Sequence, residues 1–341
     1  MILIDAVYIN NSGGLVLLNY LIDTLESTNL KVYYLLDFRI KNKHSLIKKT
    51  NSTLYLQNNF IKRVFFYINN ACNFKVILCF ANIPPPFLVK NAKVYTYFHN
   101  MNYLTNQNNL SKKKNFIFKV KSTILSLHIP FSNYWIVQSS FVKQEMLLKF
   151  KNICAENILI MPFYPSLNNL KSINKEKYSF LYVSTAFPYK NHKRLIKAFC
   201  LFYDKYKIGK LTLTITNDFH ELYNEIILLQ KNGYPIINLK YQTSEQLALI
   251  YKKSQFFIFP SLIESFGLGV VEAMENNCII IGPDLPWIKA ICIPSLIFNP
   301  LSIESIALSF ENAIYGKYND TVSLTNNKIN DIVNLFNNDN D

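Results

Sequence analysis

Short runs of uncharged apolar residues recur along the chain and alternate with longer segments whose apolar residues lie three and four positions apart. The short runs predict buried strands of a parallel sheet, and the longer segments predict helices. Strands are expected at 2–9, 32–36, 53–56, 76–80, 94–98, 134–138, 158–161, 178–183, 211–215, 236–239, 256–259, 278–281 and 296–298. Helices are expected at 15–25, 141–150, 195–202, 219–231, 245–253, 303–313 and 328–336. This alternation is typical of an α/β fold with parallel sheets.

A polar segment with a leading proline, residues 165–177, separates two halves of this pattern. The length of 341 residues fits two domains, since one domain usually holds about 100–200 residues. We therefore expect an N-terminal domain over 1–165, a C-terminal domain over 166–320, and a final helix and tail over 321–341. A polar, uncharged segment at 100–111 is expected to be a mobile loop.

The positive charge is concentrated in the first half of the chain. The whole sequence carries a net charge of +14. Residues 1–165 hold 19 Lys and Arg against 6 Asp and Glu, whereas residues 166–341 hold 17 against 16. The asymmetry indicates an anionic partner for the first half, either a membrane surface, a pyrophosphate-bearing acceptor or nucleic acid. General solubility charge is the alternative, although it does not explain the asymmetry.

A basic helix is expected from Lys112 onward, in the segment KKKNFIFKVKSTILSL. It suits contact with a membrane surface, and it equally suits a core-facing helix with a solvated basic face. The chain has no recognisable nucleic-acid-binding motif, so we expect no nucleic-acid partner. No run approaches 18 uncharged apolar residues, and the N-terminus predicts a first strand rather than a signal peptide. We expect a cytoplasmic protein whose basic first half contacts the inner face of the cell membrane.

No metal site is expected from the sequence. The six cysteines form no C-x-x-C pair and suit small core residues in a reducing compartment; they are residues 72, 79, 154, 200, 278 and 292. Asp339-Asn340-Asp341 has the form D-x-D, but it is expected at a frayed C-terminus, so we do not interpret it as a metal site.

The stretch from Phe256 to Met274 carries the strongest functional signal. An uncharged apolar run, a short loop and a helical pattern follow one another, and the start of such a helix offers free backbone N–H groups to an anion. Glu264 and Glu272 flank this place. Carboxylates do not attract phosphate, but they suit sugar or ribose hydroxyl groups beside one. The simpler interpretation is a helix with a glutamate near each end.

The spacing from Glu264 to Glu272, with Phe266-Gly267-Leu268 between them, resembles the E-x7-E signature of family 4 glycosyltransferases of GT-B fold. The resemblance implies two Rossmann-like domains with parallel sheets that face each other across a cleft. It places the nucleotide-sugar donor mainly on the C-terminal domain and the acceptor on the N-terminal domain. It further implies a retaining reaction without a bound metal or other cofactor, and a C-terminal helix that crosses back to the first domain.

Lys190 lies just ahead of an expected helix, where a cation is unfavourable unless an anion binds there. The resemblance implies that Lys190 and the start of the helix stabilise the charge of the leaving diphosphate. It further implies that Glu264 hydrogen-bonds the donor-sugar hydroxyls and that Glu272 hydrogen-bonds the ribose. Many members of the family have an Arg close to the position of Thr185, so this chain departs from the pattern there. The expected donor-binding residues are Gly13, Gly14, Thr185, Lys190, Asn191, Glu264, Ser265, Phe266, Gly267, Leu268 and Glu272; the expected catalytic residues are Glu264, Lys190 and His99.

Two features of the first half match the family only in outline. Gly13 and Gly14 follow the first expected strand, where a plain turn is an alternative to a loop over the donor diphosphate. His99 follows the expected strand at 94–98, at the carboxyl edge where such sheets bind ligands. The resemblance places His99 near the donor sugar and acceptor, while a lone histidine is often structural.

The sequence as a whole predicts a glycosyltransferase that moves a UDP- or GDP-linked sugar to a lipid-diphosphate-linked glycan, in the assembly of a bacterial surface polysaccharide. The pathway rests on the basic first half and on the resemblance. Three alternatives stay open: a GT-B enzyme that is not a transferase, such as a nucleotide-sugar epimerase, a basic nucleic-acid-binding protein, and a non-catalytic subunit of a partner enzyme.

Overall fold

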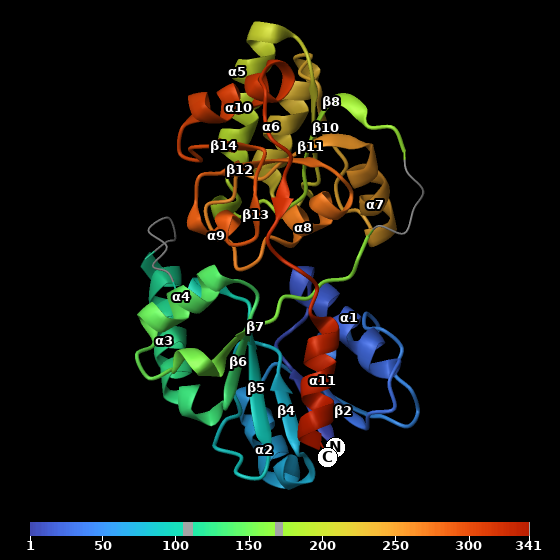
Figure 1. The fold of residues 1–341 in the computed structure, drawn as a ribbon, viewed down its shortest axis with the longest axis vertical. Coiled ribbons are helices and arrows are strands. Elements are labelled where there is room, and N and C mark those ends of the chain that lie inside the picture. Colours follow the sequence, from blue (N-terminus) through green and yellow to red (C-terminus); the bar gives the residue numbers. More distant parts are fainter. Residues whose placement is uncertain (105–111, 168–172, 341) are drawn as a thin grey trace. The chain divides into compact units, whose positions relative to one another are not determined.

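The computed structural model describes residues 1–104, 112–167 and 173–340, which form two compact units (Figure 1). The first unit takes Met1–Pro165 and Asn326–Asp341, and the second takes Ser166–Thr325. Each unit has a parallel sheet with helices packed on it, which confirms the predicted α/β class. Most of the segment expected as a mobile loop, 105–111, and the middle of the expected linker, 168–172, lie outside the described residues.

The first unit is built on a seven-stranded sheet of order β3-β2-β1-β4-β5-β6-β7, in which every pair is parallel. The strand order reverses beside β1, so the loops after β1 and β4 leave the sheet on either side of a switch point. The strands are β1 Ile2–Ala6, β2 Val32–Asp37, β3 Ser52–Leu56, β4 Val76–Cys79, β5 Lys93–Phe98, β6 Tyr134–Val137 and β7 Ile158–Ile160.

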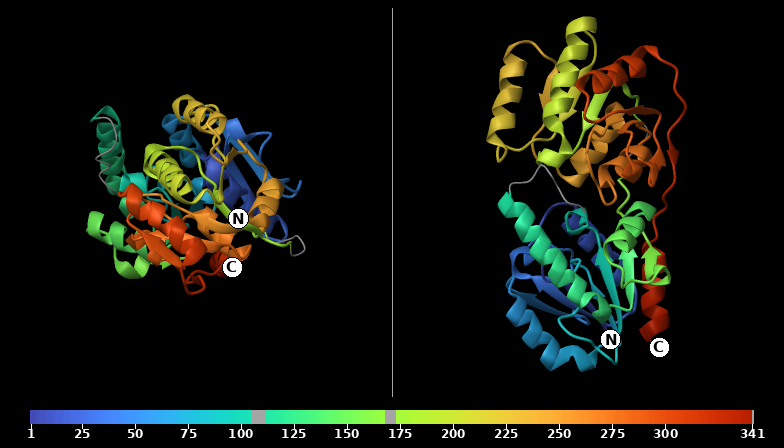
Figure 2. Two further views of the ribbon diagram at one scale, coloured as in Figure 1. Left: turned by 90° about the horizontal axis from the view of Figure 1, so that it is seen from above. Right: turned by 90° about the vertical axis from the view of Figure 1, so that its left-hand side faces the viewer.

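The helices of the first unit cover both faces of this sheet. They are α1 Ser12–Glu26, α2 Phe60–Asn70, α3 Lys112–His128, α4 Ser140–Lys149 and α11 Ile329–Asn340, with short 3-10 turns η1 Phe38–Ile40, η2 Ala71–Asn73, η3 Met101–Tyr103, η4 Ile129–Phe131 and η5 Ala155–Asn157. Helix α11 contacts β4 and α1, and lies on the opposite side of the sheet from α3 (Figure 2). Tyr95 of β5 faces α11, because its ring lies 6.2 Å from that of Phe336.

The end of α11 is anchored, so the expectation of a frayed C-terminus is wrong for Asp339. Its Oδ1 accepts a hydrogen bond from Nζ of Lys93 at 2.9 Å, and its Oδ2 accepts one from the hydroxyl of Tyr95. Both partners belong to β5. The carboxylate therefore serves the attachment of α11 to the sheet of the first unit.

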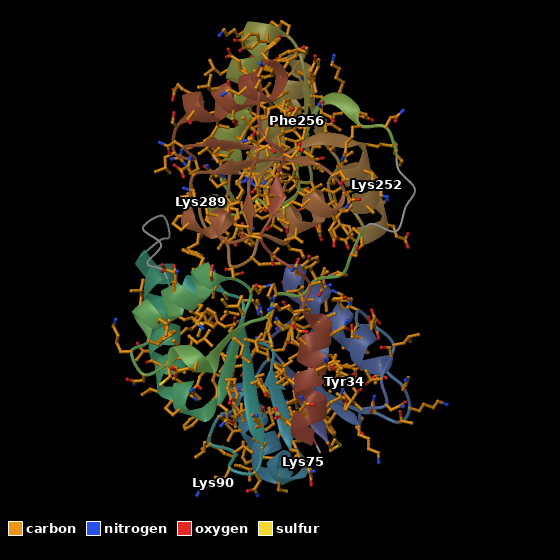
Figure 3. All side chains as sticks on the ribbon, viewed as in Figure 1. Tyr34, Lys75, Lys90, Lys252, Phe256 and Lys289 are labelled. Atoms are coloured by element: carbon orange, nitrogen blue, oxygen red, sulfur yellow. The ribbon has the colours of Figure 1, made fainter. Side chains whose placement is uncertain are left out.

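The second unit is built on a six-stranded parallel sheet of order β10-β9-β8-β11-β12-β14. Its strands are β8 Glu176–Tyr182, β9 Lys210–Leu213, β10 Ile236–Asn238, β11 Ser254–Ile258, β12 Ile279–Pro283 and β14 Leu296–Phe298; β13 Cys292–Ile293 and β15 Val322–Ser323 form a separate antiparallel pair. Its helices are α5 His192–Tyr206, α6 His220–Lys231, α7 Ser244–Lys253, α8 Leu268–Glu275, α9 Pro286–Lys289 and α10 Ile303–Tyr315, with η6 Pro188–Lys190. Phe256, labelled in Figure 3, stacks on Phe180, which packs edge-on against Phe310 of α10.

Several element boundaries differ from expectation: β1 ends at Ala6 rather than at residue 9, and α5 runs over His192–Tyr206 rather than 195–202. Helix α1 begins at Ser12, so Gly13 and Gly14 lie in its first turn and not in a turn before it. Helix α7 begins at Ser244, one residue before the expected start, and is capped by Thr243, which forms a reciprocal capping box with Gln246. Strand β15 lies in the segment expected to hold only the final helix and tail.

Candidate functional site

Lys190 and Glu264 come from loops that follow two neighbouring parallel strands of the second unit, β8 and β11. The Nζ atom of Lys190 lies 2.5 Å from Oε1 of Glu264. The side chains are 15% and 11% exposed, so the pair is sheltered but still reachable from solvent. The structure thus brings together the two residues that were expected to handle the diphosphate and the donor sugar, at the sheet edge where parallel α/β folds bind ligands.

One backbone hydrogen bond joins the two loops that carry this ion pair, and side chains of the second unit hold each loop in place. Leu262 N–H donates to the carbonyl of Tyr189 at 2.8 Å, and the hydroxyl of Tyr182 donates to the carbonyl of Lys190 at 2.8 Å. Trp287 Nε1 donates to the carbonyl of Ser261 at 3.2 Å. Because both loops are held by contacts within the unit, the ion pair is preassembled.

Asn191 acts on the same loops. It adopts a left-handed backbone conformation, with φ of 64°, between η6 and α5. Its side-chain amide donates to the carbonyls of Pro260 at 3.2 Å and Pro300 at 2.7 Å, and its Oδ1 accepts from Arg194 at 2.9 Å. The side chain is thereby committed to loop positioning. A direct contact with the donor, as expected from the sequence, stays a prediction.

The start of α8 requires its glycines. Gly267 has φ of +70°, and a Cβ there would lie 3.1 Å from the ring of Trp287. A Cβ on Gly269 would lie 3.2 Å from Phe257 and 3.3 Å from the hydroxyl of Tyr251. Absence of both side chains lets α8 begin close to the sheet, with the N–H groups of its first turn directed along the helix axis as an anion site requires.

Glu272, one turn after Leu268, is buried in the second unit. Its Oε2 accepts a hydrogen bond from the hydroxyl of Tyr251 at 2.9 Å. Burial raises the pKa of this carboxyl to about 7, although the bond from Tyr251 acts to lower the pKa. The carboxyl group therefore changes charge near neutral pH, and its expected role as the ribose partner stays a prediction.

The other expected donor residues of the second unit lie around this centre in different environments. Phe266 is buried, and Ser265 is half-buried. Thr185 is exposed, and its carbonyl accepts hydrogen bonds from Phe187 N–H and Ser184 Oγ. Within the described part of the chain, neither a hydrogen bond nor an ion pair joins Thr185 to Lys190 or Glu264.

His99 and Gly14 lie side by side in the first unit. A Cβ on Gly14 would lie 3.7 Å from Nε2 of His99, whereas a Cβ on Gly13 would meet nothing within 4 Å. The backbone N–H of His99 donates to Oδ1 of Asn82 at 2.7 Å. Burial lowers the pKa of His99 to about 4, so its imidazole is neutral at physiological pH.

The described residues form neither a metal-binding cluster nor a membrane-spanning helix. Across 1–104, 112–167 and 173–340 no cluster of three or more His, Cys, Asp or Glu side chains could hold a metal ion. None of the helices in this part of the chain has the length and apolar content needed to cross a membrane.

Residues 167–315 match the family model described as glycosyl transferases group 1. The O-antigen chain mannosyltransferase RfbU of Salmonella typhimurium is 25% identical over 154 residues, which are 44% of this chain and 42% of the relative. The match thus spans less than half the length of that curated relative.

Solved structures resemble the chain over nearly its whole length. Sucrose-phosphate synthase from Thermosynechococcus elongatus superimposes with a TM-score of 0.69 at 15% identity, over 92% of this chain and 89% of that one. Anabaena HepE in complex with UDP and glucose superimposes with a TM-score of 0.67 at 12% identity, over the same shares. The fold is the GT-B fold of these solved glycosyltransferases, and the part of the chain that is similar to glycosyl transferases group 1 is residues 167–315.

Three residues that shape the site were not singled out from the sequence. Tyr251 bonds Glu272, Asn82 holds the backbone of His99, and Trp287 covers Gly267. A sequence signal for Trp287 does exist, because the segment Pro283-Asp284-Leu285-Pro286-Trp287 resembles the sequence of the glycosyltransferase family. The other two are tyrosine and asparagine residues without a local motif, so only the folded chain reveals them.

Proposed function

We propose that the protein is a retaining glycosyltransferase of family 4, which moves a sugar from a UDP- or GDP-linked donor to a lipid-diphosphate-linked glycan. The observation that carries the proposal is the preassembled pair of Lys190 and Glu264 at the carboxyl edge of the second sheet, near the glycine-dependent start of α8. A cation and N–H groups suit the diphosphate, and a carboxylate suits sugar hydroxyls.

Each residue of this site has a chemical role in the proposal. Lys190 and the first turn of α8 stabilise the negative charge that develops on the leaving diphosphate. Glu264 accepts hydrogen bonds from the donor sugar, and Glu272 accepts them from the ribose. In the first unit, the lowered pKa of His99 keeps its imidazole neutral, so it offers the acceptor a hydrogen bond without adding charge.

The transfer balances without a metal ion or a protein nucleophile. The bond from the sugar anomeric carbon to the diphosphate oxygen breaks, and the diphosphate leaves with the electron pair. An acceptor hydroxyl forms the new bond on the same face of the sugar, and its proton passes to a phosphate oxygen. The nucleoside diphosphate and the extended glycan are the products.

The acceptor and the pathway are proposed from the first unit and from the mannosyltransferase relative. Residues 1–165 hold nearly all the excess positive charge, which suits a diphosphate-linked lipid and an anionic membrane surface. The relative RfbU is named as an O-antigen chain mannosyltransferase. The similarity supports a role for this protein in the assembly of a related surface polysaccharide.

The test is a transfer assay with purified protein, UDP- and GDP-linked sugars, and lipid-linked acceptors extracted from membranes. The proposal predicts free UDP or GDP in step with a lengthened lipid-linked glycan, and neither with Glu264→Gln. A donor that is altered with no acceptor present would instead identify an epimerase-like enzyme. Absence of both products with every donor would favour the non-catalytic subunit.

A further inference from the structure

Three apolar side chains of α2 form an exposed stripe. Ile61, Phe65 and Ile68 are 63%, 60% and 60% exposed, whereas Phe66 and Tyr67 of the same helix are buried in the core of the first unit. Positions i, i+4 and i+7 lie on one face of a helix, so the three side chains are continuous. A contiguous exposed apolar surface of this kind marks a place where a protein contacts something else.

Helix α3 carries a second stripe with the same spacing. Val120, Ile124 and Leu127 are 42%, 45% and 69% exposed, while Leu125 is buried. The six side chains Ile61, Phe65, Ile68, Val120, Ile124 and Leu127 are called the apolar ridge below.

The two helices lie on the same face of the seven-stranded sheet. Val94 of β5 belongs to the core cluster that contains Phe66 and Tyr67 of α2. Phe98, which points to the same face as Val94, packs against Tyr103, and Tyr103 accepts a hydrogen bond from α3. The stripes that point away from this face therefore point outward on one side of the unit.

The ends of the two helices also touch, which makes the apolar ridge one surface. The ring of Phe60, at the start of α2, lies 6.2 Å from the ring of His128 at the end of α3. In the right-hand view of Figure 2, α2 lies near the lower end of α3.

The segment of the chain that carries the apolar ridge has charged residues of a single sign. Between Asp37 and Glu145 the sequence contains no acidic residue and sixteen lysines and arginines. Lys62 of α2 and Lys90 are exposed, and Lys90 projects outward from the first unit in Figure 3. A positive field without carboxylates complements a surface of anionic headgroups.

We propose that the apolar ridge docks on an anionic phospholipid surface, with its six side chains at the acyl boundary and the neighbouring lysines at the phosphates. Such a surface needs apolar area and positive charge but no directional partner, which is what α2 and α3 offer. The inference deepens the proposed function and rests on it, because a lipid-linked acceptor lies at a membrane.

The experiment is vesicle flotation of the full chain, with vesicles of phosphatidylcholine alone and of phosphatidylcholine mixed with phosphatidylglycerol. The test variant is Ile61→Ser/Phe65→Ser/Ile68→Ser. The matched control is Leu201→Ser/Leu228→Ser/Leu308→Ser, which removes three exposed apolar side chains from helices of the second unit. Thermal unfolding of both variants checks that they fold, and the exposure of all six positions predicts midpoints close to the wild type.

The wild type and the control should bind the anionic vesicles, and the test variant should bind them about tenfold more weakly or worse. Lys62→Gln/Lys90→Gln should weaken binding to the anionic vesicles at low salt. Wild-type protein that stays unbound, or a test variant that binds like the wild type, would overturn the inference. A wild-type dimer that the test variant abolishes, without vesicle binding, would overturn it in favour of self-association.

Nucleotide binding on the same preparations separates this inference from the proposed function. UDP or GDP binding without vesicle binding would refute the lipid surface alone. Vesicle binding that depends on the apolar ridge, without any nucleotide binding, would refute the transferase and leave the lipid surface in place.

Discussion

The ammonium of Lys190 lies 2.5 Å from the carboxylate of Glu264, although the two residues are 74 positions apart in the chain. Parallel pairing of β8 with β11 brings their loops to the same edge of the sheet, and a backbone hydrogen bond from Leu262 to Tyr189 joins the two loops there. The two side chains neutralise each other's charge at a site where both are largely buried. Removal of one therefore leaves a sheltered, uncompensated charge.

The first prediction concerns this ion pair. Lys190→Met and Glu264→Gln should each abolish sugar transfer and lower the free energy of unfolding by about 1–3 kcal/mol. The double variant should regain most of the lost stability, because no unpaired charge remains, but none of the activity. Urea unfolding and the transfer assay measure the two effects. A fully active single variant would show that the pair is structural only.

A second prediction concerns the start of α8. Gly267→Ala should destabilise the protein by about 1–3 kcal/mol, because the positive φ is unfavourable for alanine and the new Cβ would crowd Trp287. Gly13→Ala is the control, since its Cβ would meet nothing within 4 Å and its backbone is helical. Urea unfolding of both variants checks this. Equal stability of the two would contradict the conformational requirement at Gly267.

A third prediction follows from the raised pKa of Glu272, which is about 7 against an ordinary value of 4.5. The folded state binds this proton more tightly than the unfolded state. The stabilising contribution is therefore complete below about pH 4.5 and is lost as the pH rises through about 7. Glu272→Gln, which has no proton to lose, should exceed the wild type in stability by about 3 kcal/mol near pH 8 and match it near pH 4.

Tyr251→Phe provides the companion measurement for Glu272. It removes the hydrogen bond that lowers the pKa of the carboxyl, so the loss of stability should move to higher pH. Urea unfolding from about pH 4 to pH 9 follows both variants. A Glu272→Gln variant that differs from the wild type by a constant amount at every pH would contradict the raised pKa.

A fourth prediction concerns a buried ion pair of the first unit. Arg63, 1% exposed, donates to Asp5 at 2.7 Å and to the carbonyls of Pro84 and Ile83 at 3.0 and 3.1 Å. Arg63→Met should lower the free energy of unfolding by about 3–5 kcal/mol, because Asp5 stays buried without its cation.

Arg63→Lys should lose less unfolding free energy than Arg63→Met but should stay below the wild type, because one ammonium cannot bond the carboxylate and both carbonyls. The loop after β4 that Arg63 holds also carries Asn82, the partner of His99. Chemical unfolding compares the two variants with the wild type. A loss below about 1 kcal/mol for Arg63→Met would mean that water or a neighbour compensates Asp5.

The fold followed closely from the spacing of apolar residues, because both sheets are parallel and buried. Runs such as Val32–Leu36 and Phe256–Phe259 are nearly uncharged, and each forms a strand within one or two residues of the expected limits. Two of the errors fell where a side-chain hydrogen bond decides how an element ends. Thr243 captures the N-terminus of α7 through Gln246, and Asp339 holds the end of α11 to β5.

The candidate site was only partly accessible to sequence reasoning. Lys190, Glu264 and the glycines of α8 belong to local patterns, so the sequence could point to them. The engagement of Glu272 with Tyr251 and of Asn191 with Pro260 depends on segments distant in the chain, and no local spacing encodes it. The same holds for the apolar ridge, because both faces of α2 are apolar and only packing decides which face is buried.

Every role proposed for the second unit depends on binding of the nucleoside diphosphate of a sugar donor, so the decisive experiment is titration calorimetry with UDP and GDP. It should be carried out on the wild type, Lys190→Met and Glu272→Gln. One of the two nucleotides should bind the wild type, and Lys190→Met should weaken this binding at least about tenfold. Failure of both nucleotides to bind, or equal binding by Lys190→Met, would contradict these roles.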